Sequence, residues 1–214
     1  YSYGTPQERE EFDLWKLRLK NQPQRGVFPL LSMEGGHVWD TLVRKYKKEF
    51  DEDPTMLALV WQTDGSFKRQ GPQVETTHPK VIDLFERYIK EMFEKNKWPK
   101  DQRACVGMGP ADGFGYSESP ESLAAGSGRR DPLTGLQDVT DLLILLCNQL
   151  LERMSKDYPN LYLGFYLYNV HADYPMRYKP HPRVMIVIAD INYSRLHSIL
   201  DANSKSRSYY RGIL

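Results

Sequence analysis

Three apolar runs in the second half of the chain constrain its fold most strongly. They cover 103–108, 161–168 and 184–189, and a helical repeat of leucines lies between the first two, over 138–158. Strands that are apolar throughout are typical of parallel sheets whose two faces are covered by helices. The alternation of strand and helix therefore predicts an α/β fold built from βα units.

The first half of the chain adds further elements to this pattern. We expect helices over 6–20, 38–49 and 79–95, a short buried strand over 27–31, and a hairpin over 56–71. The hairpin is indicated by Asp64-Gly65 between two extended runs, and the third helix by His78-Pro79, because proline suits the first helical turn.

Polar residues collect just past the predicted strands. Because the carboxyl ends of parallel strands meet at one edge, these side chains should converge although they lie far apart in the sequence. In a barrel that edge forms one face, whereas in an open doubly wound sheet it lines a crevice, and the pattern leaves both open. The residues concerned are Glu34, His37, Asp112, Asn169, His171, Asp190 and Asn192.

The connection over 110–137 is far longer than the two to six residues that usually join a strand to a helix. It begins Pro110-Ala111-Asp112-Gly113 and continues Phe114-Gly115-Tyr116, so glycines flank a carboxylate and an aromatic pair. This predicts a functional loop. Its segment 124–130, AAGSGRR, lacks the spacing of a phosphate-binding P-loop, and we expect a disordered or mobile segment there.

Composition excludes several classes of function. With 29 basic and 28 acidic side chains there is no basic stripe to favour nucleic acid, and no apolar run is long enough to cross a membrane. Cys105 and Cys147 both fall in apolar patterns and read as core residues, with no zinc-like spacing. We therefore expect no metal, no cofactor, no nucleic-acid partner and no membrane partner.

Aromatic residues are abundant, with 14 Tyr, 8 Phe and 4 Trp, and several lie in loops or at strand ends. They either fill the core and surface in the ordinary way or line a cleft for a flat, hydroxylated ligand such as a sugar. Trp39 and Tyr116 are the candidates for such a cleft.

Ordered motifs resemble a large bacterial domain family of unknown function that is distantly similar to α-glucuronidase-type glycoside hydrolases. The motifs are EEFDLW, EGGHVWDTLV, TDGSFKR, THPKVIDLFERYI, the Pro110–Gly113 stretch in place of an Asn-Asp-Gly-Gly type motif, Tyr158-Pro159-Asn160, and PHPRV over 180–184. The resemblance covers almost the whole chain. It implies a (β/α)8 TIM-barrel-like fold and a carbohydrate substrate.

Two departures from this family limit what the resemblance implies. Ala111 replaces the family's Asn, and the closely spaced cysteines that often follow are absent, so no metal or thiol chemistry carries over. The chain also supplies only about four barrel strands. We therefore expect residues 1–214 to form a single barrel-type domain that is a partial barrel or a segment of a larger protein with further domains. The resemblance implies a periplasmic or secreted location.

Glycoside hydrolysis typically needs two carboxyl groups across the scissile bond. Asp112 is the leading candidate, partnered by Glu34 or Asp190. Each has a structural alternative: Asp112 could brace its loop, Glu34 could be a solvated carboxylate, and Asp190 could pair with Arg183 or Arg195. His37, Trp39, Tyr116, Asn169, His171 and Asn192 are the candidate substrate-binding residues, with a structural role equally open for His37.

The residues and the resemblance together predict a carbohydrate-active protein, a glycoside hydrolase working by general acid/base catalysis. A non-catalytic carbohydrate-binding barrel and a structural scaffold are the alternatives. The scaffold alternative would leave Asp112 in a salt bridge and no open cleft.

Overall fold

The computed structural model of the chain describes residues 33–189, apart from 131–134, 169, 171–174 and 176. Internal contacts divide the chain into two units, Tyr1–Ser32 and Met33–Leu214, and the second is described here by itself. The helix expected over 6–20 and the strand expected over 27–31 lie outside the described residues.

A four-stranded parallel sheet carries the apolar runs. It consists of β1 (Met33–Glu34), β4 (Ala104–Gly107), β5 (Leu161–Leu167) and β6 (Val184–Ile188), in the order β1-β4-β5-β6. All three neighbouring pairs are parallel, as the apolar runs predict. Neighbours in the sheet therefore follow chain order, and their carboxyl ends share one edge.

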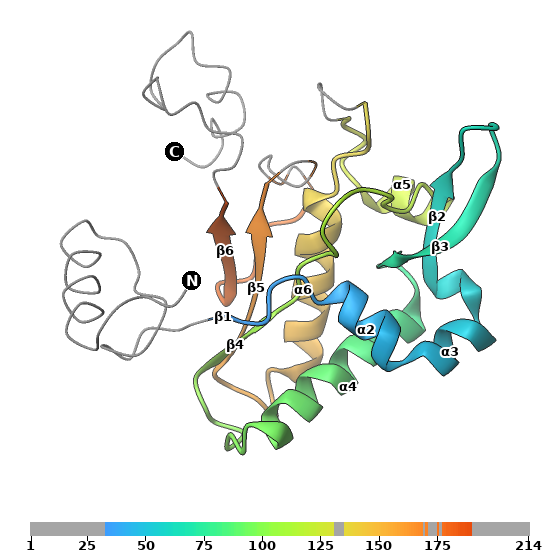
Figure 1. Cartoon of the computed structure of the whole chain (residues 1–214). Helices are drawn as coiled ribbons and strands as arrows, with labels where there is room; N and C mark the ends of the chain where they lie inside the picture. Colours follow the sequence, from blue (N-terminus) through green and yellow to red (C-terminus); the bar gives the residue numbers. More distant parts are fainter. Residues whose placement is uncertain (1–32, 131–134, 169, 171–174, 176, 190–214) are drawn as a thin grey trace, which may run out of the picture. The chain divides into compact units, whose positions relative to one another are not determined.

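Five α-helices of the described residues lie between these strands in the sequence: α2 (Trp39–Lys45), α3 (Lys47–Glu52), α4 (Pro79–Lys95), α5 (Pro120–Ala125) and α6 (Thr140–Met154). The single helix predicted over 38–49 is divided at Tyr46, whose backbone leaves helical geometry. The leucines of α6 are almost all buried and join the core with one face of α4. In Figure 1, α2, α4 and α6 lie to one side of the parallel sheet.

The hairpin predicted from Asp64-Gly65 forms a separate two-stranded sheet. After a short 3-10 turn, η1 (Pro54–Met56), β2 (Leu57–Trp61) pairs antiparallel with β3 (Phe67–Val74), and Trp61 lies opposite Phe67. The second strand runs three residues beyond its predicted end, and its last two residues, Gln73 and Val74, are buried. In Figure 1 the hairpin stands beyond the helices, away from the parallel sheet.

The long connection after β4 is more structured than predicted. It contains a short helix, α5 (Pro120–Ala125), whose N-cap Ser119 accepts a hydrogen bond from the Ser122 amide. Of the segment predicted to be disordered or mobile, 124–130, the first two residues, Ala124 and Ala125, complete this helix and are not disordered. Further on, Arg129 pairs with Asp138 at 2.8 Å.

The described residues thus have mixed α/β content with two small sheets, and they form no closed barrel. Whether the chain contributes to a (β/α)8 barrel remains a prediction. Across the described part of the chain, every helix is too short or too polar to cross a bilayer.

Candidate functional site at the strand ends

Asp112 lies in the exposed loop that follows β4. Its Oδ1 accepts a hydrogen bond from the Gly113 amide at 3.0 Å and another from the Tyr168 hydroxyl, also at 3.0 Å. The first bond shows that Asp112 does brace its own loop, and Gly113 suits this turn because its φ is +104°. Among the described residues, no Lys, Arg or His forms an ion pair with Asp112. The carboxylate therefore faces solvent without a cationic partner in that part of the chain.

Tyr168 and His37 complete this arrangement from the two strands that flank β4. Tyr168 directly follows β5, and its hydroxyl lies 3.5 Å from Nε2 of His37, which follows β1. His37 Nδ1 lies 2.7 Å from the carbonyl of Pro110; because a carbonyl only accepts, this nitrogen carries the proton and leaves Nε2 as an acceptor in the neutral ring. We call His37, Asp112 and Tyr168 the strand-end cluster.

The electrostatics of the cluster fix the direction of one hydrogen bond. Burial, followed by the hydrogen bond to Asp112 and its negative charge, raises the pKa of the Tyr168 phenol above its ordinary value. The phenol therefore stays protonated at neutral pH and donates to the Asp112 carboxylate. The phenol-to-carboxylate bond is thus a fixed feature of the cluster.

Glycine at position 109 allows the ends of β1 and β4 to approach this closely. His37 forms an isolated parallel bridge with Gly109, and the Val38 amide donates to the Gly109 carbonyl at 2.9 Å. A Cβ at Gly109 would lie 2.5 Å from the Gly36 carbonyl oxygen, which is too close for any side chain. The position of His37 beside the Asp112 loop therefore depends on glycine at 109.

The start of the Asp112 loop is fastened to the hairpin by Gln73, a residue that the sequence analysis did not identify. Its buried side-chain amide donates to the Ala111 carbonyl at 2.8 Å and accepts from the Ala111 amide at 3.1 Å. Ala111, which replaces the family's Asn, is thus bound to Gln73 through its backbone amide and carbonyl. The pair of bonds holds the residue before Asp112 in place.

Glu75 holds the far part of the same loop and was also missed. Its carboxylate, 3% exposed, accepts hydrogen bonds from the hydroxyls of Thr77, Ser117 and Ser122, each at 2.6 Å. Arg69 lies 3.1 Å from it and completes the set. Glu75 therefore joins the end of β3 to the 117–122 segment, which makes it a structural anchor.

Of the other predicted site residues, one lies at the end of β1, two are largely buried, and four lie outside the described residues. Glu34 ends β1, paired in register with Val106 of β4, which puts its backbone at the same sheet edge as Asp112. Trp39 is 2% exposed and donates its indole N–H to the Met108 carbonyl at 2.8 Å, so it belongs to the core rather than to an open cleft. Tyr116 is 9% exposed and contacts Trp39 edge-on. Asn169, His171, Asp190 and Asn192 lie outside the described residues.

One of the partners suggested for Asp190 contacts other groups in the structure. Arg183 directly precedes β6. Its guanidinium binds the Pro159 carbonyl and the Ser155 hydroxyl. Asp190 lies outside the described residues, so its pairing with Arg183 or Arg195 stays a prediction.

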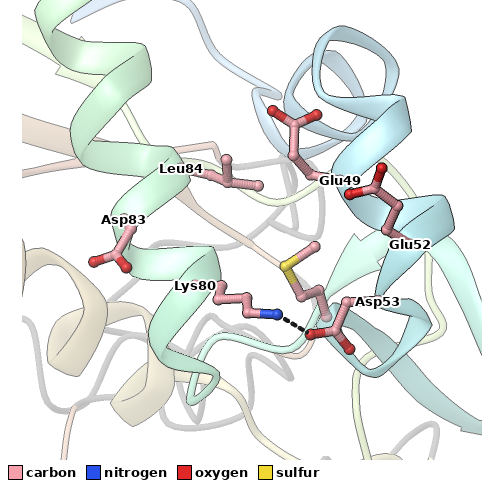
Figure 2. Close-up of a pocket in the computed structure, with 7 residues that line it drawn as sticks. Glu49, Glu52, Asp53, Lys80, Asp83 and Leu84 are labelled. Atoms are coloured by element: carbon pink, nitrogen blue, oxygen red, sulfur yellow. Dashed lines mark hydrogen bonds and ion pairs between the residues drawn. The ribbon is translucent and has the colours of Figure 1, made fainter.

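Away from the strand-end cluster, a pocket of about 350 Å³ lies between α3 and α4 and is rich in carboxylates. Figure 2 shows Asp53 and Lys80 meeting across it, at 2.7 Å, and this contact lowers the pKa of Asp53 to about 2. Asp83 pairs with Arg153 at 2.7 Å, and Glu49 pairs with Arg87. Because these acids have cationic partners, the pocket is explained by helix-to-helix ion pairing. No group of three or more metal-binding side chains occurs among the residues that the structure describes.

A comparison with models of protein families identifies the family of this chain. A model for a domain of unknown function, DUF4838, matches residues 5–213. The chain belongs to this family. The DUF4838 match contains the whole strand-end cluster, together with Gln73 and Glu75, and it confirms the resemblance to a family of unknown function. A search of curated proteins finds no match.

Proposed function

We propose that the strand-end cluster binds carbohydrate and hydrolyses a glycosidic bond, with Asp112 as one of two catalytic carboxylates. The observation that carries this proposal is the meeting of His37, Asp112 and Tyr168 from three strand ends, where the Tyr168 hydroxyl lies beside both His37 Nε2 and the exposed Asp112 carboxylate. A structural scaffold was expected to hold Asp112 in a salt bridge, and no described residue forms one with it. A site for a ligand is the better account.

The geometry suggests how the roles divide. Asp112 accepts a hydrogen bond from Tyr168, so we assign it the part of the ionised carboxylate, as nucleophile or base. The proton donor is then Glu34, at the end of neighbouring β1, or Asp190, two residues beyond β6. His37 Nε2 and the Tyr168 hydroxyl are placed to bind sugar hydroxyls. A carboxyl separation of about 5 Å would give retention, and about 6.5–9.5 Å inversion.

The fold proposed for this activity is a segment of a (β/α)8 barrel. Four parallel strands in chain order, with polar residues after their carboxyl ends, support it. An open doubly wound sheet would reverse its strand order at the binding crevice, and the four described strands keep one order. Flanking segments would supply the remaining strands.

The test compares Asp112→Asn with Glu94→Gln, which changes an exposed carboxylate on α4. Both proteins are assayed for release of reducing sugar from a panel of plant and bacterial polysaccharides. We expect Asp112→Asn to lower turnover by about 10²–10⁴-fold, the usual contribution of a general acid or base, while Glu94→Gln keeps the wild-type rate. Equal rates in the two variants would contradict a catalytic role for Asp112.

Non-catalytic carbohydrate binding is the second candidate, because aromatic side chains near the same loop remain exposed, among them Phe114 at 52%. It predicts that wild-type protein binds polysaccharide in a pull-down assay but releases no reducing sugar. In that case Asp112→Asn would weaken binding rather than turnover.

A further inference from the structure

A cavity of about 320 Å³ opens where β2 meets the loop that follows Asp112. Three aromatic residues line it, Trp61, Phe114 and Tyr116, and two of these rings are half exposed, Trp61 at 54% and Phe114 at 52%. Polar side chains lie among them, from Glu118, Arg130 and Gln137. An apolar cavity with a few polar groups is the usual form of a small-molecule site.

Gln137, which lines the cavity, carries a buried hydrogen-bond acceptor without a partner among the described residues. Its side chain is 3% exposed and donates through Nε2 to the Ser122 carbonyl at 3.2 Å. Its Oε1 is buried and has no hydrogen-bond partner among the described residues. An unmet buried acceptor costs about 1–3 kcal/mol, so a hydroxyl donor beside this cavity would be stabilising.

The cavity is attached to the strand-end cluster by a short stretch of chain. Phe114, Gly115 and Tyr116 line the cavity, and they closely follow Asp112 in the same loop. The loop is then pinned to β2, because the Glu118 amide donates to the Leu59 carbonyl at 2.8 Å. A ligand that extends from Asp112 along this loop would reach the cavity.

We propose that this cavity is a subsite for one pyranose ring of an oligosaccharide whose next part lies at the strand-end cluster. This inference rests on the proposed function. The electron-rich faces of Trp61 and Phe114 suit the polarised C–H groups of a sugar ring, as aromatic faces attract positive edges. Glu118 and the half-exposed guanidinium of Arg130 form an ion pair at 3.7 Å. In the proposed subsite Glu118 and Gln137 would accept hydrogen bonds from ring hydroxyls, and Arg130 would donate to ring oxygens.

The test measures the affinity of the full 214-residue chain for hexasaccharides by calorimetry and by tryptophan fluorescence. The panel contains β-1,4-linked glucose, xylose and N-acetylglucosamine, and α-1,4-linked galacturonate. Trp61→Ala and Phe114→Ala should each weaken binding about tenfold, comparable to the loss of one stacking ring. Trp61→Phe should keep most of the affinity but lose the fluorescence change. Leu123→Ala removes an exposed apolar side chain, at 41%, that does not line the cavity, and should change affinity less than threefold.

The outcomes separate this inference from the proposed function. If Trp61→Ala weakens binding while no protein releases sugar, the subsite stands and hydrolysis fails. If wild type hydrolyses the hexasaccharides and Trp61→Ala keeps the wild-type KM, hydrolysis stands and the subsite is overturned. Absence of binding across the whole panel, or equal losses in Leu123→Ala and Trp61→Ala, also overturns the subsite.

Discussion

Glu75 is the residue whose replacement tests the structure of the binding loop most sharply. Burial by itself raises the pKa of its carboxyl, but hydroxyl hydrogen bonds, led by that of Ser117, outweigh burial and lower it from 4.5 to about 2. A carboxyl perturbed to this extent contributes about 3 kcal/mol to folding at neutral pH. Glu75→Gln removes the charge, keeps the shape and replaces one acceptor oxygen by a donor. We expect the variant to lose about 2–4 kcal/mol of the free energy of unfolding at pH 7.

The sign of the pH dependence follows from the direction of the pKa change. A carboxyl with a lowered pKa in the folded protein stabilises it fully above the unfolded value of 4.5, and this contribution disappears as the pH falls from about 5 to about 2. Wild-type protein should therefore lose stability across this window, and Glu75→Gln should lack that component. The two proteins should converge near pH 2.

Urea unfolding followed by circular dichroism at several pH values between 2 and 7 measures both effects, with Glu94→Gln as a control for the loss of an exposed carboxylate. The control should match wild type at pH 7 within about 0.5 kcal/mol. Equal stability of Glu75→Gln and wild type at pH 7, or the same acid dependence in both, would refute the role assigned to this network.

Two further predictions concern packing. Gly109→Ala should lower the free energy of unfolding by about 1–3 kcal/mol, because its Cβ would lie 2.5 Å from the Gly36 carbonyl oxygen; an unchanged thermal midpoint would show that β1 and β4 do not meet as described. Cys105 and Cys147 are buried, and burial raises the pKa of the Cys105 thiol to about 12, so a thiol reagent at pH 8 should label neither cysteine in folded protein and both in urea. Rapid labelling of folded protein would contradict their place in the core.

Patterns of apolarity predicted the parallel sheet because they are local. The runs that became β4, β5 and β6 are apolar along their whole length, and the leucine repeat of α6 follows the helical period. The approach of His37 to the start of the Asp112 loop also followed from strand direction alone. Helix α5 could have been found from Ser119-Pro120, an N-cap residue followed by proline, but the length of the loop concealed it.

Contacts between distant segments were beyond the sequence. Glu75 binds Ser117 and Ser122, which lie more than forty positions away in the sequence. The burial of Glu75 could have been predicted only if the end of β3 at Val74 had been known, because Glu75 directly follows it. The side chain of Gln73 binds the backbone of Ala111, and a backbone partner leaves no signal in the amino-acid sequence. Trp39 was misassigned because an aromatic residue after a strand end resembles a cleft residue, whereas the first turn of α2 directs it into the core.

The proposed hydrolysis depends on a second carboxylate opposite Asp112, and a crystal structure with a bound oligosaccharide would test this most directly. The measurement is the separation between the carboxyl oxygens of Asp112 and those of Glu34 and Asp190. We expect one of these pairs to lie about 5–10 Å apart on either side of a glycosidic bond. A structure in which neither carboxyl comes within that range of Asp112, or in which the sugar binds away from the strand-end cluster, would contradict the account.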